Sequence, residues 1–154
     1  MLSEPQPLLT SFPKLLGTDG RKMSKSYNNC LYLSETPEEI TRKVMAMVTD
    51  PARVRRQDPG NPDVCPLYAL DQIFSPKAWC DHVNVECRKA GIGCVDDKKE
   101  LLKHLLAYLK PMQERRKKLQ ASPKQVAEII AAGSARARAV AQRTLAEVRE
   151  AMKL

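Results

Sequence analysis

The chain has 154 residues, of which 43% are hydrophobic and 29% are charged. A chain of this length buries about 68–70% of its unfolded surface, so it can fold without disulfides or metals. No apolar run approaches the about 20 residues of a membrane-spanning helix, and prolines interrupt residues 1–15, unlike a secretion signal. We therefore expect neither an integral membrane protein, nor a secreted precursor, nor a wholly disordered chain.

Positive charge is concentrated in the second part of the chain. The formal net charge is +8, but residues 98–154 hold 14 Lys and Arg against 5 Asp and Glu, a net +9, whereas residues 1–97 carry −1. A basic surface favours a polyanionic partner, because each phosphate contact releases counterions. Basic helix faces also keep proteins soluble, so the charge alone leaves nucleic-acid binding and simple solvation both open.

The first 35 residues predict loops and short extended segments. Three prolines before residue 14 disfavour a helix there, Gly17 and Gly20 mark a turn, and Cys30–Leu33 is typical of a brief strand. Thr36-Pro37-Glu38-Glu39 then predicts the start of a helix. Thr36 is expected to cap it, and Glu39 is expected to close a capping box.

Almost everything after residue 33 predicts helix. Helices are expected over 66–74 and 76–91, the second with Gly91 as its C-terminal cap. A long helix opens at two aspartates, 96–97, and buries a leucine face, with Pro111 expected to kink or end it. A second capping-box pattern starts at Ser122, and Gly133–Ser134 is expected to separate two further helices.

The strongest local signal is a cationic, hydroxyl-rich loop over residues 20–29. Two lysines three positions apart can converge on a triphosphate, and preorganised donors stabilise the charge that develops on a departing pyrophosphate. The loop is not a P-loop, because the Gly-x-x-x-x-Gly-Lys spacing is missing. On charge alone, a solvated basic turn is the favoured interpretation of the segment.

The sequence of this loop resembles a known family. Lys22-Met23-Ser24-Lys25-Ser26 matches the second signature (KMSKS) of class I aminoacyl-tRNA synthetases. Segments on both sides are similar to the tryptophanyl branch of that family, namely Glu4-Pro5-Gln6-Pro7-Leu8-Leu9-Thr10, Pro13-Lys14-Leu15, Thr49-Asp50-Pro51, Asp58-Pro59-Gly60-Asn61-Pro62 and Gly93-Cys94. The resemblance covers essentially the whole chain, with several motifs in the same order.

The resemblance implies a role for each residue of the pentapeptide. Lys25 would hold the ATP phosphates and favour pyrophosphate release as the aminoacyl-adenylate forms, with Lys22 assisting. Ser24 and Ser26 would shape the loop, and Met23 would anchor it. ATP, with Mg²⁺ in the intact enzyme, is the implied nucleotide, and tryptophan and tRNA are the implied partners.

The implied fold is mainly α, a helical bundle of the anticodon-binding type preceded by a short strand and loop remnant of a Rossmann catalytic domain. Residues 1–35 would be the tail of the catalytic domain, and residues 36–154 the anticodon-binding domain. Exposed bases of an anticodon are usually read by stacking, with basic side chains on the backbone. By charge, the candidates for tRNA contact are Arg115, Arg116, Lys117, Lys118, Arg136 and Arg143.

The first signature of the family is missing. That signature has two histidines close together, whereas this chain has only His82 and His104, both on predicted helices after the loop. The sequence resembles the C-terminal half of the enzyme, so we expect the isolated chain to be inactive. The intact enzyme is expected to be a cytoplasmic homodimer. The alternative is a free-standing, non-catalytic RNA-binding helical module derived from the synthetase.

The cysteines form an odd set of five, which disfavours a disulfide framework. Cys65 lies 22 positions before Cys87, Cys94 follows seven later, and Asp97 three after that. Some tryptophanyl-tRNA synthetases carry four cysteines in similar spacing and bind a [4Fe–4S] cluster, so the resemblance implies a cluster or zinc site here, with Asp97 as the fourth ligand. Buried, reduced thiols packed as small hydrophobic groups remain the alternative.

Overall fold

The structure is a computed structural model that describes residues 4–154, and its regular elements within this range are helices. The five α-helices are α1 (Pro37–Ala46), α2 (Pro66–Phe74), α3 (Lys77–Arg88), α4 (Cys94–Gln120) and α5 (Pro123–Met152). Two short 3₁₀ turns, η1 (Lys25–Tyr27) and η2 (Pro62–Val64), complete them. The predicted mainly α fold is confirmed. In the described range, no helix is both long and apolar enough to span a bilayer.

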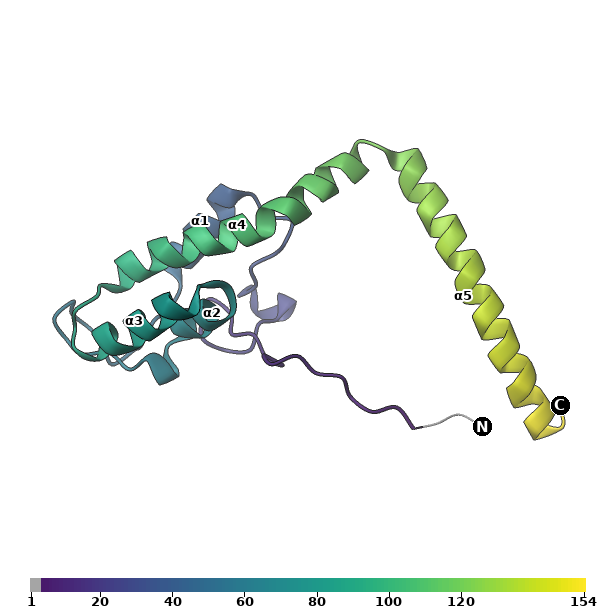
Figure 1. Cartoon of the computed structure of the whole chain (residues 1–154), viewed down its shortest axis with the longest axis horizontal. Coiled ribbons are helices and arrows are strands. Elements are labelled where there is room, and N and C mark those ends of the chain that lie inside the picture. Colours follow the sequence, from purple (N-terminus) through teal and green to yellow (C-terminus); the bar gives the residue numbers. More distant parts are fainter. Residues whose placement is uncertain (1–3) are drawn as a thin grey trace. The chain divides into compact units, whose positions relative to one another are not determined.

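The chain divides into two compact units, and the larger covers residues 9–113. Within it, α2 and α3 lie alongside the first part of α4, with α1 on that helix as well (Figure 1). The spacing of apolar residues along α4 buries one face, and the other helices complete a single core of Ile40, Val44, Leu67, Leu70, Val83, Leu101, Leu105 and Leu109. Each such side chain stabilises the unit by about 1.5–3 kcal/mol.

The start of α1 is set by its sequence, as predicted. Thr36 Oγ1 accepts a hydrogen bond from the Glu39 N–H at 3.2 Å, and Glu39 Oε2 accepts one from the Thr36 N–H at 2.8 Å. Pro37 occupies the first helical position, where its missing N–H costs nothing. The capping box is therefore confirmed.

Two long side chains of α4 hold the two ends of α1. Near the C-terminus of α1, the ammonium of the buried Lys98 donates to the carbonyls of Met45 at 2.9 Å and Met47 at 2.7 Å. Just before its N-terminus, Gln113 Nε2 donates to the carbonyl of Glu35 at 2.9 Å. Burial lowers the pKa of Lys98, because desolvation disfavours the charged form.

Two predicted helix breaks are wrong. Pro111 lies inside α4, which continues to Gln120. Proline removes the bond to the carbonyl four residues earlier, that of Ala107; both residues are exposed, so water can satisfy this carbonyl. The Gly133–Ser134 pair lies inside α5, which forms one uninterrupted helix (Figure 1). A glycine within a helix costs only about 1 kcal/mol, which its helix-forming neighbours outweigh.

Three further local predictions need correction. Cys30–Leu33 is not a strand; the only pairing in the described residues is an isolated bridge between Leu16 and Lys22. The Ser122 side chain makes no capping hydrogen bond to α5. At the end of α3 it is Ala90, with φ of 58°, that adopts the left-handed conformation, and Gly91 N–H bonds back to the carbonyl of Glu86 at 2.8 Å.

Candidate functional site

The loop of residues 20–29 is anchored to the segment that precedes it. The Gly17 N–H donates to the Arg21 carbonyl at 2.8 Å, and the Met23 N–H donates to the Leu15 carbonyl at 2.9 Å. Gly20 makes the turn between these segments with φ of 80°, a conformation that favours glycine. These hydrogen bonds and the turn therefore fix the main chain at the start of the pentapeptide.

Asn29 is the centre of the hydrogen bonds that shape the loop. Its side chain is 1% exposed. Oδ1 accepts from the Ser24 N–H at 2.8 Å, and Nδ2 donates to Asp19 Oδ1 at 2.7 Å and to the Lys22 carbonyl at 3.3 Å. One amide thus fixes the main chain at both ends of the Lys22–Ser24 segment.

Gly17 is required beside Asn29. A Cβ atom at Gly17 would lie 2.4 Å from Cγ of Asn29, closer than any real contact. The close approach lets the Thr18 N–H reach the Asn29 carbonyl at 3.0 Å. The glycine of the predicted turn is therefore required, because any larger residue at this position would clash with the Asn29 side chain.

The charged groups of the loop divide into paired and unpaired ones. Arg21 forms an ion pair with Asp19 at 2.7 Å and lies over the Tyr27 ring, 4.2 Å from its centre. The hydrogen bond from Asn29, with those from Arg21, lowers the pKa of Asp19 to about 2. Lys22 and Lys25 are exposed, and their ammonium groups have no partner among the described residues.

The other residues of the pentapeptide have supporting positions. Met23 and Ser24 are half-buried, and Ser26 is exposed on η1. The loop therefore presents two free ammonium groups and one hydroxyl on a main chain held by Asn29. Such an arrangement can bind a polyanion, since its donors are held in place before the anion arrives. The roles assigned to Lys22 and Lys25 stay predictions.

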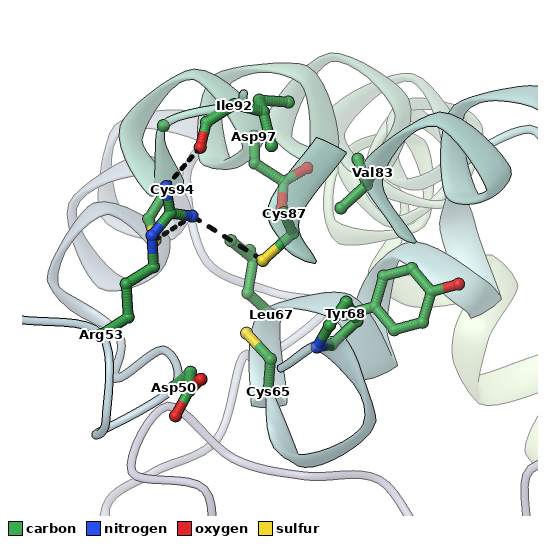
Figure 2. Close-up of a pocket in the computed structure, with 12 residues that line it drawn as sticks. Asp50, Arg53, Cys65, Leu67, Tyr68, Val83, Cys87, Ile92, Cys94 and Asp97 are labelled. Carbon is green, nitrogen blue, oxygen red and sulfur yellow. Dashed lines mark hydrogen bonds between the residues drawn. The ribbon is translucent and has the colours of Figure 1, made fainter. Parts of the chain in front are cut away.

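A second site surrounds the predicted cysteine ligands. Cys65 and Cys87 are buried, Cys94 is half-buried, and all three line a small cavity of about 10 Å³, the space one water molecule needs. Arg53 reaches this cavity, and its guanidinium lies at Cys87 and Cys94 (Figure 2). Nη1 donates weakly to both sulfur atoms, each at 3.7 Å.

Arg53 is held by the main chain as well as by the thiols. Its Nη2 donates to the carbonyls of Arg56 at 2.8 Å and Ile92 at 2.7 Å. Gly60 allows the close packing here, since a Cβ atom on it would lie 2.6 Å from the Cys87 sulfur. Burial raises the pKa of Cys65 and Cys87, which favours neutral thiols.

Asp97, the expected fourth ligand, lines the same cavity, but its carboxyl is engaged by other groups. Its Oδ1 accepts from Trp79 Nε1 at 3.2 Å, and its carboxyl faces that of Asp71. Asp71 is fully buried; its Oδ1 accepts from Ser75 Oγ at 2.6 Å, whereas Oδ2 receives no hydrogen bond from a conventional donor. Desolvation raises the pKa of Asp71 to about 8 and that of Asp97 to about 6.

These observations test the predicted metal site. In the part of the chain that the structure describes, no three potential ligands converge as a metal site would require. A guanidinium lies against two of the thiols, and a cation there disfavours a second cation at the same position. The cavity also has no room for a cluster. Cys65, Cys87, Cys94 and Asp97 therefore do not fit a [4Fe–4S] cluster or a zinc ion in this structure.

The predicted tRNA-contacting residues all lie on exposed helical surface. Arg115, Arg116, Lys117 and Lys118 follow one another near the end of α4, so they point in different directions around the helix. Arg136 and Arg143 are seven residues apart on α5 and share one face. Their charge makes a basic surface, and their contacts with tRNA remain predictions.

Three residues that organise these sites are not marked by any motif of the sequence. Asn29 falls only within the cationic loop of residues 20–29, and Arg53 belongs to none of the predicted sites. Asp71 gave one usable signal, a carboxylate within an otherwise apolar helix, because charged residues are rarely fully buried unless paired.

Comparisons with known proteins give the family. The family described as tRNA synthetases class I (W and Y) matches residues 1–110. A tryptophan–tRNA ligase of Thermotoga maritima is 46% identical over 155 residues, which cover 98% of this chain and 46% of that protein. One from Aquifex aeolicus is 44% identical over 152 residues, covering 98% of this chain and 38% of that protein.

A solved structure agrees with these relatives. The tryptophanyl-tRNA synthetase of Campylobacter jejuni, in complex with ADP and tryptophan, superimposes with a TM-score of 0.76 at 27% identity. The match covers 92% of this chain and 44% of that one. The chain thus spans less than half the length of these relatives. Its sequence and fold together establish that the chain belongs to the class I tRNA synthetases of the tryptophan and tyrosine type.

Proposed function

We propose that these residues are the C-terminal portion of a tryptophan–tRNA ligase, which binds ATP phosphates through the KMSKS loop and recognises the tRNA anticodon through its helices. The observation that carries the proposal is the pair of ammonium groups of Lys22 and Lys25, which have no partner within residues 4–154, on a loop fixed by Asn29. Identity of 44% and 46% to tryptophan–tRNA ligases supports tryptophan as the amino acid.

In the proposed reaction a carboxylate oxygen of tryptophan bonds to the α-phosphorus of ATP, and the bond from that phosphorus to the bridging oxygen breaks. Negative charge then grows on the departing pyrophosphate. Lys25 contacts this group directly and Lys22 assists, while Ser24 and Ser26 complete the loop and half-buried Met23 anchors it. Because Asn29 already fixes the main chain, little reorganisation accompanies charge development. Mg²⁺ enters with the nucleotide.

The helical part supplies the second half of the proposal. Residues 1–35 form the end of the catalytic domain, and residues 36–154 form the tRNA-binding domain. The net charge of +9 over residues 98–154 supports contact with an RNA backbone, through Arg115, Arg116, Lys117, Lys118, Arg136 and Arg143. The intact ligase acts as a cytoplasmic homodimer, and these 154 residues alone do not form the adenylate.

A chimera tests the catalytic part. The 154 residues are fused to the preceding part of the Thermotoga maritima ligase, and tryptophan-dependent ATP–pyrophosphate exchange is measured. We expect Lys25→Ala to lower the exchange rate by about 100- to 1,000-fold, the effect of removing one preorganised donor. Lys14→Ala is the control, because Lys14 is exposed and lies outside the loop.

Full exchange in both Lys25→Ala and Lys22→Ala would contradict the proposal. That outcome would favour the alternative function, a non-catalytic RNA-binding helical module. The alternative needs the basic surface but makes no use of either loop lysine.

A further inference from the structure

Two thiols meet beside a guanidinium where α3 gives way to α4, and the proposed function uses neither of them. Cys87 is in the last turn of α3, and Cys94 is the first residue of α4. Nη1 of Arg53 lies 3.7 Å from each of the two sulfur atoms (Figure 2). Because one nitrogen contacts both sulfurs, they lie at most twice this distance apart.

The surroundings of the two sulfurs allow them to approach each other. Both cysteines line the small cavity of about 10 Å³ described above, so unfilled space adjoins them. Residues 89–93 join α3 to α4 outside both helices, and such a loop adjusts more readily than a helix. A disulfide requires the sulfurs to be about 2 Å apart and the Cα atoms about 4.4–6.8 Å apart. A change of cysteine rotamer with a small adjustment of the loop can provide this geometry.

Cys94 is the thiol that a small oxidant reaches first. It is half-buried, and it also lines a second, open cavity of about 380 Å³. Cys87 is buried and does not belong to the lining of this open cavity. Oxidation is therefore expected to begin at Cys94, with Cys87 behind it.

Arg53 favours this chemistry at Cys94. The guanidinium lines both cavities, and its Nε is buried without a hydrogen-bond acceptor among the described residues. An oxygen atom in the cavity is the kind of acceptor that this N–H lacks. A cation beside a cysteine at the start of a helix also stabilises the negative charge that the sulfur carries when it attacks. Burial raises the pKa of Cys87, so that group stays a neutral thiol.

We propose that hydrogen peroxide oxidises Cys94 and that Cys87 then closes a disulfide with it. First, the Cys94 sulfur bonds to one peroxide oxygen, the O–O bond breaks, and the departing oxygen leaves as water with the thiol proton. Next, the Cys87 sulfur bonds to the Cys94 sulfur, the S–O bond of the sulfenic acid breaks, and the Cys87 proton leaves with that oxygen as water. The two sulfurs lose two electrons in total, and the peroxide gains them.

The spacing of the cysteines provides an internal control. Cys80, Cys87 and Cys94 are each seven positions apart, so an unfolded chain closes the pairs Cys80–Cys87 and Cys87–Cys94 with equal ease. In the folded chain, Cys80 and Cys87 share α3, where seven residues span about 10.5 Å, too far for a disulfide. Cys80 also lines neither cavity, and its Sγ donates to the Asp71 carbonyl at 3.4 Å. A preference for Cys87–Cys94 therefore reports on the fold.

The experiment treats the reduced 154-residue chain with hydrogen peroxide, alkylates the remaining thiols, and identifies linked tryptic peptides by mass spectrometry. We expect three of the five cysteines to be alkylated and residues 78–88 to be linked to residues 90–98. Fragmentation should place the bond at Cys87, and Cys80→Ala should leave it intact. In urea, the same treatment should give Cys80–Cys87 and Cys87–Cys94 in similar amounts.

Three variants test the order of the steps and the role of Arg53. In Cys87→Ser the sulfenic acid of Cys94 should persist and react with dimedone, a reagent for that group. Arg53→Met should slow the oxidation of Cys94 about tenfold, because the charged donor to its sulfur is lost. Arg55→Met is the control and should stay within about twofold, since Arg55 lines the open cavity but donates to neither sulfur. Circular dichroism checks folding, and the dimedone result decides the proposal if Arg53→Met does not fold.

Several results would overturn the proposal. They are equal yields of Cys80–Cys87 and Cys87–Cys94 in the folded chain, a bond from Cys65 to either thiol, a disulfide between two chains, and oxidation of Cys94 no faster than that of buried Cys30. The inference does not depend on the proposed function. Pyrophosphate exchange by the reduced chimera reports on the loop lysines, whereas the linked peptides report on the thiols, so either can fail without the other.

Discussion

The buried carboxyl pair of Asp71 and Asp97 gives the protein a pH-dependent stability that can be predicted. Asp71 is 0% exposed, and the atom of its carboxyl without a donor lies against the carboxyl of Asp97. A proton on Asp71 supplies the missing hydrogen bond. This explains why the pKa of Asp71 rises to about 8, so that the group is neutral in the folded protein at pH 7 and ionised in the unfolded chain.

The sign follows from the direction of the shift. Because the folded pKa of Asp71 is raised, its contribution is fully present below the unfolded value of 3.8 and is lost as pH rises toward about 8. The maximum slope is about 1.4 kcal/mol per pH unit for one proton. Between pH 4 and 7 the free energy of unfolding should therefore fall by roughly 2–4 kcal/mol.

Asp71→Asn tests this reasoning. The amide keeps an acceptor for Ser75 Oγ and replaces the proton by an N–H that donates to Asp97. We expect the variant to be more stable than the parent by roughly 3–5 kcal/mol at pH 8, with the difference vanishing near pH 4. Urea unfolding at each pH, followed by the fluorescence of Trp79, measures it, because Trp79 donates to Asp97.

The control is Asp81→Asn on α3, an exposed carboxylate paired with Lys77 at 3.0 Å. Its effect on stability should be small and nearly independent of pH above pH 5. An Asp71→Asn variant that is less stable than the parent at pH 8, or that keeps the parent's slope between pH 6 and 8, would refute the assignment of a neutral Asp71. Asp97, with a pKa of about 6, accounts for the dependence that remains below that range.

Three other substitutions test the contacts that hold the structure together. Asn29→Ala should cost about 2–3 kcal/mol and speed amide hydrogen exchange in residues 22–26, since three hydrogen bonds are lost. Lys98→Met should lower the free energy of unfolding by about 2–3 kcal/mol in denaturant titrations, because the carbonyls of Met45 and Met47 at the end of α1 lose their donor. Gly60→Ala should cost about 1–3 kcal/mol through the clash with the Cys87 sulfur, and thermal unfolding should show that Cys87→Ala in the same chain relieves it.

Local features of the fold could be predicted from the sequence. The capping box of Thr36 and Glu39 and the leucine stripe of 101–109 depend on residues within one or two turns of each other, so their spacing is sufficient. The KMSKS pentapeptide can likewise be recognised from the sequence, because its five residues are adjacent. Its shape, however, depends on Asn29 and Asp19, which the sequence pattern does not mark as partners.

The contacts that sequence reasoning missed join residues far apart in the chain. Arg53 lies 34 positions before Cys87 and 41 before Cys94, and the cysteine spacing alone gives no sign of a guanidinium beside the thiols. The spacing was compatible with a metal site, but Asp97 turns to Trp79 instead. The spacing of candidate ligands shows which of them are close in the sequence. It does not show which groups from other segments lie between them in the folded protein.

The helix breaks at Pro111 and Gly133 were wrong for an energetic reason. Each residue imposes a local cost, and a prediction from one residue does not include the many helix-forming neighbours that offset it. The exposed position of Pro111 further reduces the cost, because the freed carbonyl meets water.

The two side chains that tie α1 to α4 have a mechanical consequence for the loop. Lys98 and Gln113 attach α1 near both of its ends, so α1 cannot pivot independently of α4. The attachment through Gln113 is at the carbonyl of Glu35, nine positions after Ser26, the last residue of the KMSKS segment. A tilt of α4 on binding a ligand would therefore move α1 with it, and would displace the segment that leads back to the lysine-bearing loop.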